Sequence, residues 1–364
     1  MTPTQLQTHD ALLAQLRVMT VFVTTRCNAR CETCFYWDSL NDDSGVMGLA
    51  ELERVARTMP KFPHLLLSGG EPFMRKDLVE VVSLFKKHND IKTIDSPTNG
   101  LWPDQVEYFV EKMLTTYPDL RMTVGVSLDG LEKTHDRLRA VPGNFKKAME
   151  TLNRLSRLRD RLAPGVVPTP VQVLTLTCYN TTNMHEMEAL THYITEHADV
   201  DGMMFEVIRG NPKDPNLQAP PVEIFDAITR RSIEVNSRLY EKRMGPERDI
   251  RISYLKSVYW MQRQMLVKGR LPLLCRAGIN LGVLEPKGDV RLCELLESVG
   301  NVKDFDYDFG ALWHSERASK QRKWITDSRC SCTHCVNIGH SIGADFWVNK
   351  RREFYEYLSE KSLL

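Results

Sequence analysis

The sequence has no excess of either charge, no long apolar run and no export signal at its start. Its 48 Lys and Arg residues balance 47 Asp and Glu residues, so no global charge favours nucleic acid or an acidic membrane surface. The opening segment lacks a basic start followed by an apolar stretch. No later apolar run approaches the roughly 18 residues of a membrane span. We therefore expect a cytoplasmic protein with no nucleic-acid partner and no membrane span.

Nine cysteines are present, and eight of them fall in two groups. Cys27, Cys31 and Cys34 form the spacing CxxxCxxC. The second group lies near the end of the chain and consists of Cys275, Cys293, Cys330, Cys332 and Cys335. In a reducing compartment, closely spaced thiols are typical of metal or catalytic sites rather than of disulfides. The remaining cysteine, Cys178, is expected in the core.

Between residues 18 and 208, short β-rich segments alternate with longer segments of helical period. The predicted strands span 18–24, 64–68, 91–95, 121–128, 169–177 and 203–208. The predicted helices span 49–59, 77–88, 103–114, 144–160 and 183–197. This alternation predicts a parallel βα array. In such arrays ligands bind at the carboxyl ends of the strands, which is where the first cysteine group lies.

The later part of the chain has a different pattern. Residues 211–221 are rich in proline and asparagine and are expected to close the first domain. Two helical segments follow, at 222–243 and 254–269. Residues 279–294 alternate around a Pro-Lys-Gly-Asp turn, which predicts a β-hairpin.

A basic run, RLSRLRDR, occupies residues 154–161. Leu152, Leu155, Leu158 and Leu162 form an apolar stripe at helical spacing. The arginines of the run are therefore expected on the solvated face of a helix rather than in a phosphate-binding patch.

The first cysteine group has polar residues between its thiols. Three cysteines on one face of a buried helix are the alternative, but the segment has little apolar character, which favours a loop wrapped around a ligand. A structural zinc site has four protein ligands. Iron–sulfur clusters are normally held by four thiolates. A four-iron cube held by three thiolates leaves one iron free for an exchangeable ligand.

A CxxxCxxC sequence directly after the first strand of a βα array resembles the signature of the radical S-adenosylmethionine (SAM) enzymes. The resemblance implies an α/β fold built on a partial (β/α)6 TIM-like barrel. It implies that Cys27, Cys31 and Cys34 hold a [4Fe–4S] cluster whose open iron binds SAM. In that family an electron from the cluster cleaves SAM to a 5′-deoxyadenosyl radical, and a donor such as flavodoxin or ferredoxin supplies the electron.

Companion motifs stand at the ends of later strands, in the order that the family has. The resemblance implies SAM contacts by Ser68, Gly69, Gly70, Glu71, Asn99, Ser127, Asp129 and Arg139. One position departs from the pattern. The family usually has an aromatic residue just before the third cysteine, whereas this sequence has Thr33 there.

The second cysteine group reads as C-x12-G-x4-C followed by a CxxC pair. From spacing alone, zinc is an equal alternative to an iron–sulfur cluster. Beside a radical SAM core, the arrangement resembles a twitch domain, a shortened SPASM domain with one auxiliary [4Fe–4S] cluster. The resemblance implies ligation by Cys275, Cys293, Cys332 and Cys335, with Cys330 as a substitute or a spare thiol.

The resemblance also predicts how the chain is divided. The expected regions are a radical SAM core at 1–215, a helical connector at 216–271, a small α+β twitch/SPASM-like cluster domain at 272–340 and a closing helix at 341–364.

Several side chains outside the cysteine groups are assigned on weaker grounds. Glu294 follows Cys293 where sulfatase-maturing relatives have an acidic proton acceptor, so it is the candidate base. Glu206 and Arg209 leave the sixth strand and are candidates for substrate contact. We expect His64, His334 and His340 to be structural or exposed, and Tyr254 and Trp260 to lie in the core.

The expected function is that of a radical SAM oxidoreductase. It would abstract hydrogen from a small or medium metabolite, which is a sugar, aminocyclitol, nucleotide conjugate or lipid-linked precursor, in a net oxidation assisted by one auxiliary cluster. The alternative is a peptide (RiPP) maturase that forms a crosslink or an epimer. A non-catalytic zinc protein is a third possibility, from a different class.

Overall fold

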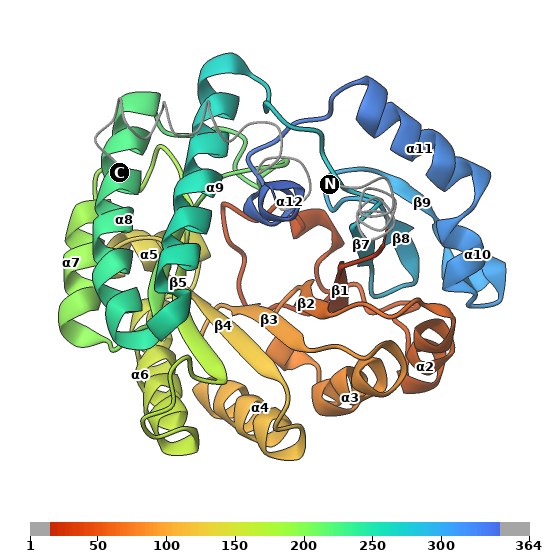
Figure 1. Ribbon diagram of the computed structural model, residues 1–364, viewed down its shortest axis with the longest axis horizontal. Helices are drawn as coiled ribbons and strands as arrows, with labels where there is room; N and C mark the ends of the chain where they lie inside the picture. Colours follow the sequence, from red (N-terminus) through yellow and green to blue (C-terminus); the bar gives the residue numbers. More distant parts are fainter. Residues whose placement is uncertain (1–14, 343–364) are drawn as a thin grey trace, which may run out of the picture.

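A curved nine-stranded sheet forms the centre of the protein (Figure 1), of which the computed structural model describes residues 15–342. The strand order is β6-β5-β4-β3-β2-β1-β7-β8-β9. The strands are β1 (Val18–Thr24), β2 (His64–Gly69), β3 (Thr93–Thr98), β4 (Arg121–Ser127), β5 (Val171–Tyr179), β6 (Gly202–Val207), β7 (Leu281–Leu284), β8 (Asp289–Arg291) and β9 (Ser298–Asn301). Neighbours from β6 to β7 run parallel, and the last two pairs run antiparallel.

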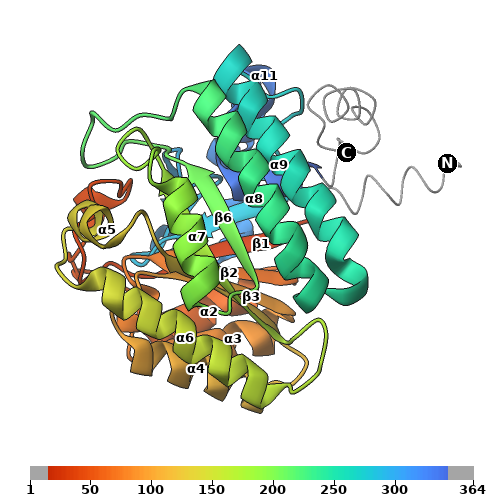
Figure 2. The same ribbon diagram turned by 90° about the vertical axis from the view of Figure 1, so that its left-hand side faces the viewer.

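The helices are α2 (Leu49–Thr58), α3 (Leu78–Asn89), α4 (Pro103–Thr116), α5 (Glu132–Arg139), α6 (Asn144–Leu162), α7 (Met187–His197), α8 (Val222–Arg243), α9 (Arg248–Lys268), α10 (Phe309–Trp313), α11 (Glu316–Asp327) and α12 (Cys335–Ser341). Helices α2, α3, α4 and α6 cover the convex side of the sheet (Figures 1 and 2). Helix α12 lies on the concave side, between the strands and α9 (Figure 1). Among the described strands the sheet stays open between β6 and β9, so the predicted partial barrel in the α/β class is confirmed.

The sequence located most elements, with a few differences. Strand β3 begins two residues later than expected, at Thr93 rather than at residue 91. The sequence analysis did not predict strand β9 or helices α5, α10, α11 and α12, and all of these except the 12-residue α11 are short. The closing helix predicted at 341–364 lies almost wholly outside the described residues. No helix within residues 15–342 is both long and apolar enough to cross a bilayer.

The hairpin predicted at 279–294 is present as β7 and β8. Its place in the fold was not predicted, because β7 also pairs in parallel with β1, from Val18 opposite Leu281 to Val21 opposite Leu284. All seven residues of β1 are buried between the two neighbouring strands and the helices. The segment that carries the second cysteine group is therefore continuous with the sheet of the barrel.

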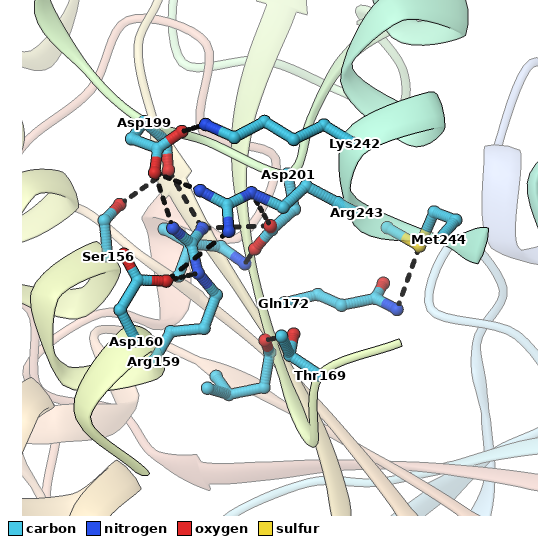
Figure 3. Close-up of polar contacts among 12 residues, drawn as sticks. Ser156, Arg159, Asp160, Thr169, Gln172, Asp199, Asp201, Lys242, Arg243 and Met244 are labelled. Atoms are coloured by element: carbon cyan, nitrogen blue, oxygen red, sulfur yellow. Dashed lines mark hydrogen bonds and ion pairs between the residues drawn. The ribbon is translucent and has the colours of Figure 1, made fainter. Parts of the chain in front are cut away.

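The expectation that the arginines of residues 154–161 are solvated is wrong for Arg159, whose side chain is fully buried. Its guanidinium reaches Asp160, Asp199 and Asp201 at 2.8–2.9 Å (Figure 3). Arg243 of α8 pairs with Asp199 as well. The 3.6-residue period places Arg159 beside the leucine stripe, and tertiary structure supplies the carboxylates that make its burial possible. This ion-pair network joins α6 to α8 and to the start of β6.

We expect Arg159→Leu to lower the free energy of unfolding by about 3–5 kcal/mol, because it leaves the buried carboxylate of Asp201 without its main partner. Urea unfolding of the whole chain measures the change. The control is Arg161→Leu on the same helix, where the arginine is 59% exposed and the expected loss is below about 1 kcal/mol. Equal losses for the two variants would contradict this role for the network.

Candidate active site

The first cysteine loop is held against the end of β2 by backbone contacts. Gly70 N donates to Thr24 O at 2.9 Å, and Glu71 N donates to Arg26 O at 2.8 Å. A Cβ atom on Gly70 would lie only 2.1 Å from Arg26 O. The glycine is therefore required for the close approach of these two chain segments. This contact fixes the residue that directly precedes Cys27.

The loop after β3 joins the same assembly. Asn99 Nδ2 donates to Asn28 Oδ1 at 2.7 Å, which ties this loop to the cysteine loop. Glu71 accepts hydrogen bonds from Thr98 Oγ1 at 2.8 Å and from Asn99 N at 2.7 Å. Burial nevertheless raises the pKa of Glu71 to about 7. Sequence reasoning did not identify Asn28, because an asparagine between two cysteines has no distinctive signal.

The three thiols of the first group lie close enough to influence one another. Burial raises the pKa of Cys27 to about 12 and that of Cys34 to about 11, and neighbouring thiols add to both shifts. The pKa of Cys31 is also raised by burial, while Arg139 opposes that shift. Free thiolates are thus disfavoured in this loop, and a bound metal cluster would supply the missing positive charge.

Arg139 connects the cysteine loop to the end of β4. Its Nε lies 2.7 Å from Asp129 Oδ2, and its Nη1 lies 3.8 Å from Cys31 Sγ. The same carboxylate accepts a hydrogen bond from Cys178 N at 2.8 Å. Ser127 ends β4, two residues before Asp129. The side chains predicted to contact SAM therefore lie at successive strand ends around the first cysteine group.

The aromatic residues that follow the third cysteine have separate places. Tyr36 packs edge-on against Phe22, with ring centroids 4.9 Å apart. Trp37 is 41% exposed. Phe35 lies beneath the guanidinium of Arg209, at 5.2 Å. Thr33, at the position where the family has an aromatic residue, is buried.

Cys293 is the most buried thiol of the second group, and Asn337 Nδ2 donates to its Sγ at 3.2 Å. Burial raises the pKa of Cys275 to about 12, with further increments from Cys332 and Cys330. The pKa of Cys293 is raised in the same way, with increments from Glu294, Cys332 and Cys275. The mutual effects on their pKa values show that the thiols of Cys275, Cys293, Cys330 and Cys332 lie near one another.

Cys335 has a different partner in this structure. Its thiol donates to Glu206 Oε1 at 3.0 Å. The structure thus brings both Cys330 and Cys332 towards Cys275, and it places Cys335 at the first turn of α12 against β6. The chain offers five thiols for the four positions of an auxiliary cluster.

Arg209 links the two cysteine groups. Its Nη1 lies 2.8 Å from Glu206 Oε2, and its Nε lies 2.8 Å from Glu294 Oε1. His334 Nε2 approaches the same oxygen of Glu294 at 3.2 Å. Arg209 thus contacts the segment next to Cys293, and Glu206 contacts Arg209 and Cys335. Contact of Glu206 and Arg209 with substrate stays a prediction. His334, expected to be structural or exposed, lies buried in this network.

Within residues 15–342, no three His, Cys, Asp or Glu side chains converge closely enough to hold a single metal ion. The thiolates of a four-iron cube bind to different iron atoms, so they surround a volume and do not converge on one point. Both cysteine groups supply several thiols that do not converge on one point, which suits an iron–sulfur cluster better than a single metal ion.

Comparisons with known proteins agree with this geometry. Residues 21–193 match the model of the radical SAM superfamily. The matched region begins in β1 and ends in α7, so it contains the first cysteine loop and the following strand ends. Residues 21–193 therefore form a radical SAM domain, and members of that superfamily use a [4Fe–4S] cluster and SAM.

Two relatives illustrate the range of similar sequences. A probable GTP 3′,8-cyclase of Methanococcus maripaludis is 25% identical over 219 residues, which cover 59% of this chain and 66% of the relative. An Fe-coproporphyrin III synthase of Methanosarcina barkeri is 29% identical over 133 residues, which cover 36% of this chain and 32% of the relative. The chain thus matches just under two thirds of the length of the cyclase.

Solved structures show the same fold. The structure of anSMEcpe with bound AdoMet and a Cp18Cys peptide has a TM-score of 0.59 at 15% identity, and the match covers 95% of this chain and 98% of that one. Streptococcus suis SuiB bound to S-adenosylmethionine has a TM-score of 0.59 at 13% identity, over 88% of this chain and 72% of that one. At these identities the likeness concerns the fold alone.

The raised pKa of Glu71 predicts a pH effect. Its folded-state pKa of about 7 lies above the ordinary glutamate value of 4.5, so the native state binds the extra proton and loses stability as the pH rises through this window. We expect Glu71→Gln to lessen that loss, by at most about 1.4 kcal/mol per pH unit. Urea unfolding of both proteins from about pH 5 to about pH 8 measures the difference in slope. Parallel slopes would show that Glu71 does not titrate in this range.

Proposed function

We propose that the protein is a radical SAM oxidoreductase that abstracts hydrogen from a small or medium metabolite, in a net oxidation assisted by one auxiliary [4Fe–4S] cluster. The observation that carries the proposal is the joining of three strand-end loops around CxxxCxxC, through Gly70, Glu71 and the pair of Asn28 with Asn99. When bound, the cluster and SAM supply a 5′-deoxyadenosyl radical.

The residues of the first site fit that cofactor pair. Cys27, Cys31 and Cys34 would hold the cluster and leave one iron open. The residues that would contact SAM are Ser68, Gly69, Gly70, Glu71, Asn99, Ser127, Asp129 and Arg139. Arg139 is anchored by Asp129 through Nε, so its Nη groups keep a fixed direction towards Cys31.

The second group would hold the auxiliary cluster in a twitch/SPASM-like region at 272–340. Cys275, Cys293 and Cys332 would be ligands, and Cys335 would be the fourth, with Cys330 as its competitor. Helices α8 and α9 would form the connector at 216–271, after a core at 1–215. The closing helix at 341–364 stays a prediction.

Glu294 is our candidate for the base that accepts a substrate proton. Its side chain is 8% exposed and is fixed by Arg209 on one side and His334 on the other. These contacts orient its carboxylate beside Cys293 in the network that reaches β6. An electron donor such as flavodoxin or ferredoxin and a small-molecule substrate would be its partners.

The relatives support a metabolite as substrate. Their names refer to GTP, to Fe-coproporphyrin III and to pre-heme d1, none of which is a peptide. A peptide (RiPP) maturase is the alternative. Incubation with candidate peptides encoded beside the gene separates the two functions, because only the alternative predicts a mass change in a peptide.

The cysteine assignments predict distinct losses of iron. We expect Cys31→Ala to remove about four iron and four sulfide ions per chain and to abolish dithionite-driven 5′-deoxyadenosine formation. Replacing all five distal cysteines by alanine is expected to leave about four iron ions at the first site. Metal and sulfide analysis of protein purified without oxygen measures both results.

Cys178→Ala is the control for these cysteine variants, since Cys178 belongs to neither group. It should keep both clusters. If the protein without distal cysteines retains no iron, or if the wild type contains zinc without sulfide, the proposed function is wrong.

The proposed role of Glu294 predicts that its replacement uncouples SAM cleavage from product formation. Once a metabolite screen has identified an oxidised product, Glu294→Gln should lower the ratio of that product to 5′-deoxyadenosine by about 10²-fold or more, as is typical for removal of a general base. Glu297→Gln, an exposed neighbour, serves as the control. An unchanged ratio in Glu294→Gln would assign proton transfer to another group.

A further inference from the structure

The second cysteine group offers five thiols, whereas a four-iron cube has four iron corners. The proposed function gives the fourth corner to Cys335 and names Cys330 as its competitor. The segments that carry these two thiols have different contacts, and these contacts show which thiol faces the other three.

The segments next to Cys275 and Cys293 touch each other. A Cβ atom at Gly278, three residues after Cys275, would lie only 2.8 Å from Leu292 Cδ1. Leu292 directly precedes Cys293. Close packing at Gly278 therefore brings the chain that follows Cys275 against the chain that precedes Cys293.

Helix α11 is fixed to the same place. Arg322 on this helix donates through Nε to Gly278 O, and a Cβ atom at Gly278 would lie 3.2 Å from Arg322 Cγ. After the helix the chain folds back, so that Cys330 N donates to Ile325 O at 3.0 Å. Cys330 is thus the first thiol after a helix that is anchored three residues from Cys275.

Apolar packing groups the same thiols. Cys293 and Ile325 belong to the main apolar core of the protein. Cys275 and Cys330 both pack against that core. The pKa of Cys332 is raised by burial, with an increment from Cys330, which agrees with a short distance between these two thiols.

Helix α12 turns a different face towards this group. Asn337 Nδ2 donates to Cys293 Sγ at 3.2 Å, and Ser341 Oγ accepts from Arg276 N at 3.1 Å. Residues four apart share one face of a helix, so Asn337 and Ser341 mark the face of α12 that lies against the cysteine group. Cys335 precedes Asn337 by two residues, which places it about 200° around the helix. Its side chain therefore points away from that face.

The contacts of Cys335 agree with this direction. Its thiol donates to Glu206 Oε1 at 3.0 Å, on strand β6 of the barrel. Ile338 and Ile342, three and seven residues further on, share its face of the helix. Cys335 packs with them against a second apolar cluster beside α9. The cluster consists of Val258, Trp260, Met261, Leu271, Leu273, Ile338 and Ile342.

We propose that Cys330 is the fourth ligand of the auxiliary cluster, and that Cys335 stays a thiol hydrogen-bonded to Glu206. The other three ligands are those of the proposed function, Cys275, Cys293 and Cys332. The inference rests on the proposed function, because it requires the auxiliary cluster, and it exchanges one ligand of that cluster. The CxxC spacing favours Cys335 in the sequence, but the first turn of α12 directs this thiol towards β6.

The test uses the full chain with Cys27, Cys31 and Cys34 all replaced by alanine, so that only the second group can hold a cluster. After reconstitution without oxygen, this chain should contain about four iron and four sulfide ions. Adding Cys330→Ala should remove at least about half of this iron, because the cube loses a ligand. Adding Cys335→Ala, or the matched control Cys178→Ala, should leave the iron content and the electron paramagnetic resonance (EPR) spectrum of the reduced cluster unchanged.

Serine variants keep the size of the side chain, so they guard against a loss of folding in the alanine variants. Cys330→Ser replaces the ligand sulfur by oxygen and should shift the EPR g values of the auxiliary cluster. Cys335→Ser should not shift them. Circular dichroism of the cluster-free chains compares the folding of all variants.

Loss of iron in Cys335→Ala, an unchanged cluster in both Cys330 variants, or equal changes in the Cys330 and Cys335 variants would overturn the proposal. A normal iron content that depends on Cys335 would contradict only the choice of ligand. Absence of iron and sulfide from the chain that lacks only the first three cysteines would contradict the auxiliary cluster of the proposed function, and this inference with it.

Discussion

The rest of the structure depends on how the open side of the curved sheet is covered. Six parallel strands do not close into a barrel, so their concave face must be shielded by other segments. The chain solves this with α9, α12 and the hairpin that continues the sheet beyond β1. The ion pair of Arg209 with Glu294 joins the end of β6 to that hairpin. This ion pair is almost fully buried. Its burial is tolerated because Glu206 and Glu294 both contact the guanidinium cation of Arg209.

The segments that cover the concave face also connect the two cysteine groups. The first group follows β1 directly, and the second group is carried by segments that pair with β1 or contact β6. Phe35, one residue beyond Cys34, lies under the same arginine that holds Glu294. In the proposed function, the radical-generating site and the candidate base thus lie on either side of Arg209.

Prediction from sequence was strongest where local chemistry is distinctive. The CxxxCxxC spacing, the glycines at the end of β2 and the Asp129 to Arg139 segment pointed to one region, and the structure brings these segments together. Prediction failed for Arg159, because a 3.6-residue period shows which face a residue occupies and not which carboxylates other elements bring to it. The partner of Cys335 was equally inaccessible, since Glu206 is distant in sequence.

The amino-acid sequence by itself determined the α/β class, most strand and helix positions, the two cysteine groups and the family to which they point. These features arise from short-range periodicity and spacing, which the chain carries locally. Only the tertiary structure decided that the hairpin extends the barrel sheet, that Arg209 lies between Phe35 and Glu294 and that His64 pairs with Asp95. Such relations depend on register and packing between segments far apart in the chain, for which a single sequence has no local signal.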